Sequence, residues 1–378
     1  MRTFKCVDLF CGAGGLSEGF RQNGFEILLA NDFDTWCEAT YKLNHPETEF
    51  ISGPIQNISA EQILISLKMK KGELDCIIGG PPCQAFSVYN HQRGMHDERS
   101  GLFREYLRLV AGLLPKYVII ENVPGMTSVE DGIAVKEIKS GLKSLGYEVE
   151  VKLLKAENYG VAQERRRLIF IGNRVGQEIE FPQHTHGDGL LPFVTVWDVI
   201  SDLPKLENGE GSEVMNYSIP PQSDYQKLIR DGSPMIFNHV APALGAINLE
   251  RLKYIPEGGS WRDIPIELLP AGMKRARRSD HTKRYGRLKK DGFASTILTK
   301  CDPHWGAFFH PEQDRVITVR EAARLQCFPD KIRFEGSKVE QYKQVGNAVP
   351  VLLSAAVAKV VYNALLENEN GTVRLYAI

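Results

Sequence analysis

A cysteine that follows two prolines is the residue of this chain best suited to nucleophilic chemistry. Residues 79–87 read GGPPCQAFS, so that an apolar, strand-like run ends and Cys83 follows a Pro-Pro turn. Proline fixes its φ angle, and the turn therefore restricts the loop that presents the sulfur. Most cysteines are inert core residues, but Cys83 is expected outside the core, among residues that orient it. We predict that Cys83 is a nucleophile.

A carboxylate stands at the end of the next apolar run. In the segment YVIIENVPGM, Glu121 and Asn122 close a strongly apolar stretch. A lone glutamate at such a position is usually a solvated turn residue. In a sheet wound in the usual manner, however, this run neighbours the one before Cys83, and both end at the same edge. A thiol and a carboxyl group facing one pocket can attack an electron-poor ring and protonate its nitrogen.

A glycine loop near the start of the chain has the composition of a cofactor site. Residues 7–16 read VDLFCGAGGL, and small residues after a strand let a ligand approach the backbone. A dinucleotide fingerprint would place a third glycine where Ser17 stands, which disfavours NAD. Asp32, at the end of the second strand-like run, suits a ribose, and Phe33 beside it can cover a flat base.

Alternating strands and helices are predicted to carry these residues. The strand-like runs lie at residues 6–10, 26–30, 76–80, 117–123, 149–154 and 167–172. Helix-length amphipathic segments lie between them at residues 60–70, 102–114 and 133–145. Runs that are apolar on both faces suit a sheet covered by helices on both sides. The fold class predicted is α/β, an open doubly wound and mostly parallel sheet.

The alternation stops in the second half of the chain. Residues 182–292 are rich in Gly, Pro, Asn and Asp, which predicts a second, smaller and irregular domain. The apolar stretch at residues 351–366 is expected to form a helix that packs back onto the first domain. We therefore expect one domain at residues 1–182 plus 344–378 and the other at residues 183–343.

Composition excludes several classes of protein. The chain has 378 residues, of which 43% are apolar and 25% charged, as in ordinary soluble proteins. No apolar stretch is expected to approach the roughly 18 residues that a membrane span needs. No cleavable leader is expected after the basic start, which predicts a cytoplasmic protein. The seven cysteines contain no C-x-x-C pair, which argues against a disulfide framework. We reject a metal site at His184, His186, Cys301 and His304.

A basic run interrupts an otherwise neutral chain. Residues 274–290 read KRARRSDHTKRYGRLKK, with nine Lys or Arg and one Asp, although the net charge of the chain is −1. Such a run is either a solvated charged face or the local electrostatic footprint of a nucleic-acid site. We expect phosphate contacts from the run at Arg277, Arg278, Lys283 and Arg284.

The motifs together resemble, in order and spacing, the bacterial-type DNA (cytosine-5) methyltransferase family. The resemblance covers most of the chain outside residues 183–295. It rests on the segments DLFCGAGG, GGPPCQAFS, ENVPGM, QERRRLIFIG, HPEQDRVITVREAARLQCFPD and YKQVGNAVPVLL.

The resemblance implies S-adenosylmethionine as the cofactor, no metal, and duplex DNA as the partner. The cofactor would be held by Phe10, Gly12, Ala13, Gly14, Leu16, Asp32, Phe33, Ile55, Leu102, Asn347, Ala348 and Val349. The residues implied at the catalytic pocket are Cys83 as nucleophile, Glu121 as acid, Arg165 and Arg167. Those in or beside the loop that closes over DNA are Gln84, Ser87 and Arg99.

The implied reaction transfers a methyl group to C5 of a flipped-out cytosine through a covalent Cys83 adduct at C6, with Glu121 acting at N3. Residues 1–182 plus 344–378 would then be the catalytic domain and residues 183–343 the target-recognition domain and hinge. We expect a monomer that serves a restriction-modification system, with a cognate endonuclease as functional partner. A tRNA-modifying relative and a catalytically dead binding subunit remain alternatives.

One position departs from the family pattern. The third cofactor segment usually offers an Asp before Ile55, but Pro54 stands there. Proline has neither a side-chain acceptor nor an N–H group. The usual contact to the adenine amino group is therefore expected to be missing.

Overall fold

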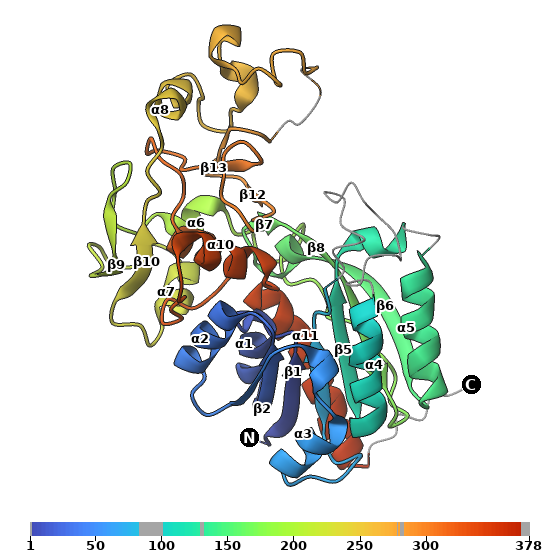
Figure 1. Cartoon of the computed structure of the whole chain (residues 1–378). Helices are drawn as coiled ribbons and strands as arrows, with labels where there is room; N and C mark the ends of the chain where they lie inside the picture. The colour runs from blue at the N-terminus through green and yellow to red at the C-terminus, as the bar shows by residue number, and fades with distance from the viewer. Residues whose placement is uncertain (1, 83–100, 129–131, 278, 280–282, 372–378) are drawn as a thin grey trace. The chain divides into compact units, whose positions relative to one another are not determined.

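The computed structural model describes residues 2–82, 101–128, 132–277, 279 and 283–371. The chain divides into two compact units (Figure 1). The first unit comprises Met1–Lys155, Arg166–Gln183 and Val351–Ile378, and the second comprises Ala156–Arg165 and His184–Pro350. Residues 344–350 therefore lie in the second unit. The assignment of separate tasks to the two units stays a prediction.

A seven-stranded sheet organises the first unit, with the strand order β3-β2-β1-β4-β5-β8-β6. All neighbours from β3 to β5 are parallel, whereas β8 runs antiparallel to both β5 and β6. This arrangement confirms the predicted open, mostly parallel sheet. The strands are β1 (Phe4–Leu9), β2 (Phe25–Asp32), β3 (Glu49–Ser52), β4 (Cys76–Gly79), β5 (Tyr117–Asn122), β6 (Glu148–Lys155) and β8 (Arg166–Asn173).

Burial explains which strands could be recognised in the sequence. Every residue of β4 and β5 is buried, as their continuous apolar runs require in a sheet that is covered on both faces. The edge strand β3 has the sequence EFIS and is only half-buried, so its sequence carries no strand signal. It was not predicted.

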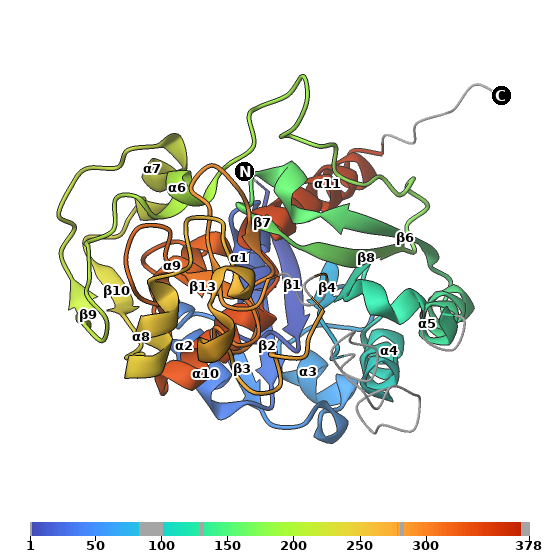
Figure 2. The same ribbon diagram turned by 90° about the horizontal axis from the view of Figure 1, so that it is seen from above.

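Helices cover both faces of this sheet (Figure 2). On one face, α3, α4 and α5 build the main apolar core with residues such as Phe103, Leu109 and Ile138. On the other face, α1 packs against α11, and the rings of Phe4 and Tyr362 meet edge to face at 5.2 Å. The helices are α1 (Gly15–Arg21), α2 (Thr35–Asn44), α3 (Ala60–Ser66), α4 (Leu102–Leu113), α5 (Ile133–Ser144) and α11 (Val351–Glu369), with 3₁₀ turns η1 (Ile55–Asn57) and η4 (Pro124–Thr127).

One helical stretch has the length and apolar composition that a membrane span needs. It covers Lys338–Glu369, so the expectation that no segment passes this test was wrong. Half of its most apolar window is buried inside the protein. The Ser354 hydroxyl of α11 donates to the Leu16 carbonyl of α1 at 2.7 Å. Core helices of soluble proteins pass the same test, and this packing matches the expected return of the helix onto the sheet.

Short elements joined by long connections make up the second unit. Its strands are β7 (Gln163–Glu164), β9 (Gly211–Met215), β10 (Ile236–Val240), β11 (Gly286–Arg287), β12 (Ala294–Ser295) and β13 (Ala307–Phe309). Its helices are α6 (Val196–Ile200), α7 (Asp224–Arg230), α8 (Ala246–Leu252), α9 (Val319–Leu325) and α10 (Lys338–Asn347), and its 3₁₀ turns are η6 (Ala156–Tyr159), η7 (Trp261–Asp263) and η8 (Ile266–Leu268).

Buried arginines in α9 and in the segment that precedes it form ion pairs inside the second unit. The Arg324 guanidinium lies between Asp202 and Asp330, with its Nη2 at 2.6 Å from Asp330 Oδ2. Arg315 donates both terminal nitrogens to Glu321, at 2.7 and 2.8 Å. Burial alone would raise the pKa of Glu321, but the charge and hydrogen bonds of Arg315 hold that pKa well below its usual value. These arginines are fully buried structural residues.

Candidate active site

The register of three parallel strands brings the segments that follow them, which carry predicted catalytic and cofactor-binding residues, to one edge of the first unit's sheet. Leu9 of β1 pairs with Gly79 of β4, and Gly79 pairs with Ile120 of β5. The residues that follow these three positions therefore emerge side by side at the carboxyl ends of the strands. The chain winds in opposite directions from β1 and β4, and open α/β sheets bind ligands in the crevice that such a reversal creates.

The glycine loop after β1 turns sharply and leaves open space beside its backbone. Phe10, Gly12 and Gly14 all have positive φ angles, of 60°, 54° and 83°. A β-carbon added at Gly12 would meet no atom within 4 Å, so a ligand can approach the backbone there. A β-carbon at Gly14 would lie 3.1 Å from the Tyr41 ring, so Gly14 is required for packing. Ala13 and Leu16 are buried beneath the loop.

Asp32 ties this loop to the end of β2. Its Oδ2 accepts from the Gly12 amide and its Oδ1 from the Asp34 amide, both at 2.9 Å. Burial raises the pKa of Asp32, and the two amide hydrogen bonds oppose that shift. Phe33 follows with 66% of its side chain exposed, which leaves its ring free to cover a ligand.

The third predicted cofactor segment is anchored from α4. Ile55 is buried, and its carbonyl accepts from Arg108 Nη2 at 3.1 Å. Pro54 precedes it as the cap of η1 with a φ angle of −63°. Leu102, the first residue of α4, packs against the main apolar core. Ile55 and Leu102 therefore belong to the same apolar core, with Ile55 held by a side chain of α4.

Glu121 and Arg167 form a close charged pair. Arg167 Nε lies 2.5 Å from Glu121 Oε1, and both side chains are about nine-tenths buried. The approach is not aligned as a hydrogen bond, since Arg167 Nε has no properly directed acceptor. A β-carbon at Gly80 would lie 3.0 Å from Glu121 Oε2. The carboxyl group thus lies against the segment that leads from β4 toward Cys83.

Asn122 also lies at this edge, although it was not predicted as a site residue. Its Nδ2 donates to the Pro81 carbonyl at 3.0 Å, and its Oδ1 accepts from the Val123 amide at 2.8 Å. Asn122 therefore holds the first proline of the Pro-Pro turn against the end of β5. Its place beside Glu121 in the sequence was the available signal.

Arg165 is bound to backbone carbonyls of the second unit. Its Nη2 donates to Gly346 at 2.9 Å and to Ala348 at 2.8 Å, and its Nη1 donates to Ile297 at 3.1 Å. The side chain is 1% exposed. These bonds hold the backbone on both sides of Asn347. The implied place of Arg165 at the catalytic pocket stays a prediction.

Two buried glutamines, Gln163 and Gln326, complete this support. Gln163 Nε2 donates to Gln326 Oε1 at 3.1 Å, and Gln326 Nε2 donates to the Val345 carbonyl at 2.8 Å. Gln163 Oε1 accepts from the Ile297 amide at 2.8 Å. Neither glutamine was predicted as a site residue, although Gln163 lies in the motif QERRRLIFIG and Gln326 in the motif that ends in RLQCFPD. Asn347 itself is exposed and Val349 is buried.

The predicted phosphate-binding residues differ in exposure and in the partners of their charges. Arg277 is exposed, whereas Lys283 Nζ lies 2.7 Å from Glu164. The guanidinium of Arg284 lies 4.9 Å from the centre of the Trp305 ring. Five predicted residues lie outside the described part of the chain, namely Cys83, Gln84, Ser87, Arg99 and Arg278. Within the described part, no three His, Cys, Asp or Glu side chains gather as metal ligands.

The sheet order, the glycine loop and the strand-end carboxylates define a class I methyltransferase fold. A family profile described as C-5 cytosine-specific DNA methylase matches residues 4–363. The chain belongs to this family and is a DNA (cytosine-5-)-methyltransferase.

Relatives of similar length support this assignment. The chain is 35% identical to the type II methyltransferase M.AgeI of Thalassovita gelatinovora, with 96% of this chain and 100% of that protein covered. It is 35% identical to M1.HphI of Haemophilus parahaemolyticus, covering 94% and 86%. A solved structure described as a DNA modification methyltransferase encoded in an E. coli prophage matches with a TM-score of 0.77, at 27% identity over 97% of this chain and 100% of that one.

Proposed function

We propose that this enzyme methylates C5 of a flipped-out cytosine in a specific duplex DNA sequence through a covalent adduct of Cys83. The observation that carries the proposal is the position of Glu121, which is paired with Arg167 and lies against Gly80 where the segment toward Cys83 begins. A thiol delivered beside a buried acid and a guanidinium matches the requirements of addition to a pyrimidine ring.

The first unit has the features that S-adenosylmethionine requires. The open space at Gly12, the carboxylate of Asp32 and the exposed ring of Phe33 suit a backbone approach, a ribose and an adenine. A β-carbon at Gly53 would likewise meet no atom within 4 Å. When bound, S-adenosylmethionine supplies the methyl group. Within the first unit, we assign its binding to the loop from Phe10 to Leu16, Asp32, Phe33, Ile55 and Leu102.

The residues of the chain account for the other steps. The Cys83 thiolate bonds to C6 while Glu121 donates its proton to N3, so that the C5=C6 electron pair becomes available at C5. Arg167 holds the base carbonyl and offsets the charge that develops there. After C5 has been methylated, its proton passes to a water molecule, and the electrons of the C5–H bond re-form the C5=C6 bond as the C6–S bond breaks. Glu121 then recovers the proton from N3, and the thiolate is regenerated.

Arg165 acts in this proposal by positioning another segment. Its three carbonyl partners, together with Gln163 and Gln326, fix the turn that presents Asn347 and Val349. A β-carbon at Gly346 would clash with the Leu298 carbonyl, so this turn also needs its glycine. Hydrogen bonds of this kind restrict the segment before a ligand binds, which reduces the ordering cost of binding.

DNA binding is assigned to the second unit and to the segment around Cys83. Gln84, Ser87 and Arg99 are proposed to close over the DNA. Arg277 and its neighbours in the basic run are proposed to contact phosphates. The names of the type II relatives support a role as the modification enzyme of a restriction-modification system, acting on DNA in the bacterial cytoplasm.

Covalent trapping tests the mechanism. Genomic bisulfite sequencing of expressing cells first identifies the modified sequence. A duplex with 5-fluorocytosine at that site should then form an adduct with the wild-type enzyme, since fluorine cannot leave as the C5 proton does. Cys83→Ala should form none, and Cys301→Ala is the matched control because the Cys301 thiol is buried. A wild-type enzyme that methylates the site but never forms the adduct would exclude the covalent step.

Methyl transfer to DNA and to tRNA, measured side by side with tritiated cofactor, tests the substrate. We expect incorporation into DNA alone. Incorporation into tRNA alone would support the tRNA-modifying alternative, and incorporation into neither would support a catalytically inactive binding subunit.

A further inference from the structure

The basic run of the second unit divides into cations that are neutralised within the unit and cations that are not. Lys283 pairs with Glu164 at 2.7 Å, Lys289 with Asp291 at 3.0 Å, and Lys290 with Glu312 at 2.6 Å. Arg287 is buried and bonds to Asp314 at 2.7 Å and to backbone carbonyls. The charges of these four side chains are therefore already balanced within the unit.

Arg284 belongs to the second group. It is half-buried and forms no salt bridge with any carboxylate of the described residues. Its guanidinium carbon instead lies 4.9 Å from the centre of the Trp305 ring, within the range of a cation–π contact. Such a contact orients the guanidinium and leaves its net positive charge unbalanced.

Trp305 is exposed over 52% of its side chain, although tryptophan is usually well buried. Its ring meets the His304 ring edge to face at 5.1 Å, and His304 meets Tyr285 in the same way at 5.7 Å. The Tyr285 hydroxyl lies 3.3 Å from His304 Nδ1. Partial burial and the nearby charge of Arg284 lower the pKa of His304, so this stack is neutral around pH 7. The Trp305 ring therefore packs against His304, which packs in turn against Tyr285.

The backbone around Arg284 is equally constrained. Tyr285 has a φ angle of 48°, which is unfavourable for a bulky residue and persists only where the surroundings enforce it. The Tyr285 amide donates to the Pro303 carbonyl at 2.6 Å, and the Arg284 carbonyl accepts from the Trp261 amide at 3.0 Å. These bonds fix Arg284 against the turn that carries Trp305. The pair is preorganised.

We propose that Arg284 and Trp305 form a preorganised DNA contact of the second unit, in which Arg284 pairs with a phosphate and the Trp305 ring packs on the adjoining sugar. The proposal rests on the proposed function, which makes duplex DNA the substrate. Tryptophan and arginine are enriched among the residues that contribute most of the binding energy of interfaces. An unbalanced cation beside an exposed, rigid ring thus fits a polyanion with apolar sugars.

Neighbouring charge favours the same partner. Lys274, Arg275 and Arg277 are exposed and form no ion pair with any residue in the described part of the chain. In Figure 1 the orange segment after α8 lies at the opposite end of the second unit from α7.

Phosphate and sugar contacts carry no sequence information. Arg284 and Trp305 should therefore contribute equally to the affinity for target and for non-target duplexes.

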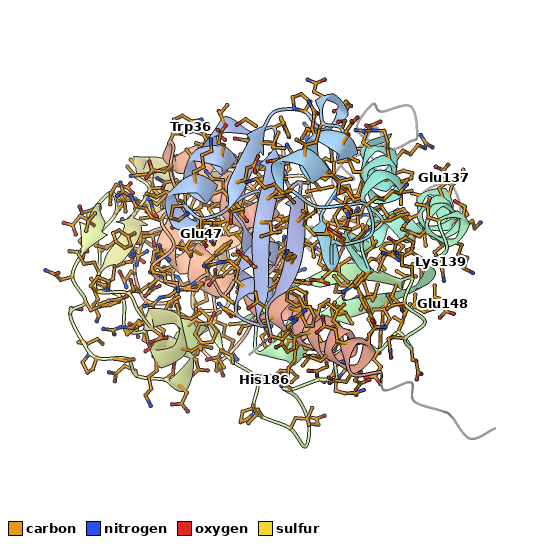
Figure 3. All side chains as sticks on the ribbon, turned by 90° about the horizontal axis from the view of Figure 1, so that it is seen from below. Trp36, Glu47, Glu137, Lys139, Glu148 and His186 are labelled. Atoms are coloured by element: carbon orange, nitrogen blue, oxygen red, sulfur yellow. The ribbon has the colours of Figure 1, made fainter. Side chains whose placement is uncertain are left out.

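DNA affinity measured over several salt concentrations tests this proposal with a mixed-sequence duplex. Trp305→Ala should weaken binding about tenfold without changing the slope of log affinity against log salt. Arg284→Ala should weaken binding and reduce that slope by about 0.9, the value for one released counterion. Trp36→Ala is the matched control, because Trp36 is 45% exposed on α2 of the first unit (Figure 3) and should leave the affinity unchanged.

Tryptophan fluorescence gives a second measurement that does not depend on a truncation. Adding the duplex should quench the emission of the wild-type enzyme and of Trp36→Phe, whereas Trp305→Phe should lose most of the response. If Trp305→Ala fails to fold, as judged by its melting temperature and cofactor affinity, Arg284→Ala and Trp305→Phe decide the question.

The outcomes separate this proposal from the function on which it rests. Wild-type affinity and salt slope in Arg284→Ala, with an unchanged fluorescence response in Trp305→Phe, would overturn the contact. Methyl transfer by the wild-type enzyme to its own target site is measured in parallel. If the wild-type enzyme methylates DNA while these variants bind normally, only the contact is wrong. If the wild-type enzyme neither binds nor methylates DNA, the proposed function fails first.

Discussion

Arg167 Nε lies 2.5 Å from Glu121 Oε1, between the antiparallel neighbours β8 and β5. The pair joins residues 46 positions apart, and the antiparallel register makes this possible by setting Asn122 opposite Leu168, the residue after Arg167. Arg167 thus lies at the same sheet edge as the start of the segment leading to Cys83. The pair therefore holds the carboxyl group to which we assign proton donation at this edge of the sheet.

Glu121→Gln should slow the chemical step far more than it weakens binding. The amide keeps the shape of the side chain but cannot donate the proton proposed for N3, so single-turnover methyl transfer should fall roughly a hundredfold or more. Rapid-quench kinetics and separate DNA and cofactor titrations measure the two effects. Glu148→Gln, an exposed change on β6 (Figure 3), is the control. A near-normal single-turnover rate in Glu121→Gln would remove this residue from the catalytic site.

Pro54→Asp tests the departure from the family pattern. Pro54 has a φ angle of −63°, which aspartate can adopt, so the new carboxylate should reach the adenine amino group without strain. Cofactor binding should tighten by about 0.5–1.5 kcal/mol, the worth of one hydrogen bond. Calorimetric titration with S-adenosylhomocysteine measures the change, and Pro54→Ala controls for the loss of proline. Weaker binding by a folded Pro54→Asp enzyme would mean that this pocket recognises adenine by other groups.

Asp8 should make the stability of the enzyme depend on pH. Burial raises the pKa of Asp8 to about 8, partly offset by the 2.5 Å hydrogen bond from Ser17. The unfolded chain loses this proton near its ordinary pKa of about 4, whereas the folded chain keeps it. The free energy of unfolding should therefore fall as the pH rises from 5 to 8, by at most about 1.4 kcal/mol per unit from this group.

Asp8→Asn isolates that contribution, because asparagine fills the same space and does not titrate. Urea unfolding of both proteins at several pH values measures the difference. The stability advantage of Asp8→Asn should grow with pH. Parallel curves for the two proteins would show that Asp8 has an ordinary pKa.

The salt dependence of DNA binding should distinguish Arg277 from Lys283. Arg277 is exposed and unpaired within the described residues, so Arg277→Ala should reduce the slope of log affinity against log salt by about 0.9. Lys283 is already balanced by Glu164, so Lys283→Ala should change the slope less. Equal slope changes for both variants would mean that the Lys283 pair opens when DNA binds.

Arg324→Met should destabilise the second unit strongly. Removing this guanidinium leaves the carboxylates of Asp202 and Asp330 buried without their main counter-charge, which costs about 3–5 kcal/mol in comparable cases. Thermal unfolding measures the loss, and Arg277→Met is the exposed control. A change below about 1 kcal/mol would show that the buried pair is replaceable by apolar packing.

Local sequence patterns predicted the central strands of the sheet. Buried parallel strands need continuous apolar runs, so β4 and β5 could be recognised directly, and each is followed by the residues of a motif. The edge strand β3 and the two-residue strands of the second unit escaped prediction. Their formation depends on neighbours that come from distant parts of the chain.

The identity of the protein and its candidate chemistry were determined by the sequence alone, because motifs such as GGPPCQAFS and ENVPGM combine reactive groups with the turns that present them. Only the tertiary structure decided what the arginines do. Arg165, Arg167, Arg284 and Arg324 look alike in sequence. Yet one holds backbone carbonyls, one pairs with the acid, one lies over an exposed ring and one is buried between two aspartates. The physical reason is that a cation's role depends on which partners lie within a few ångströms, and those partners come from remote segments of the chain.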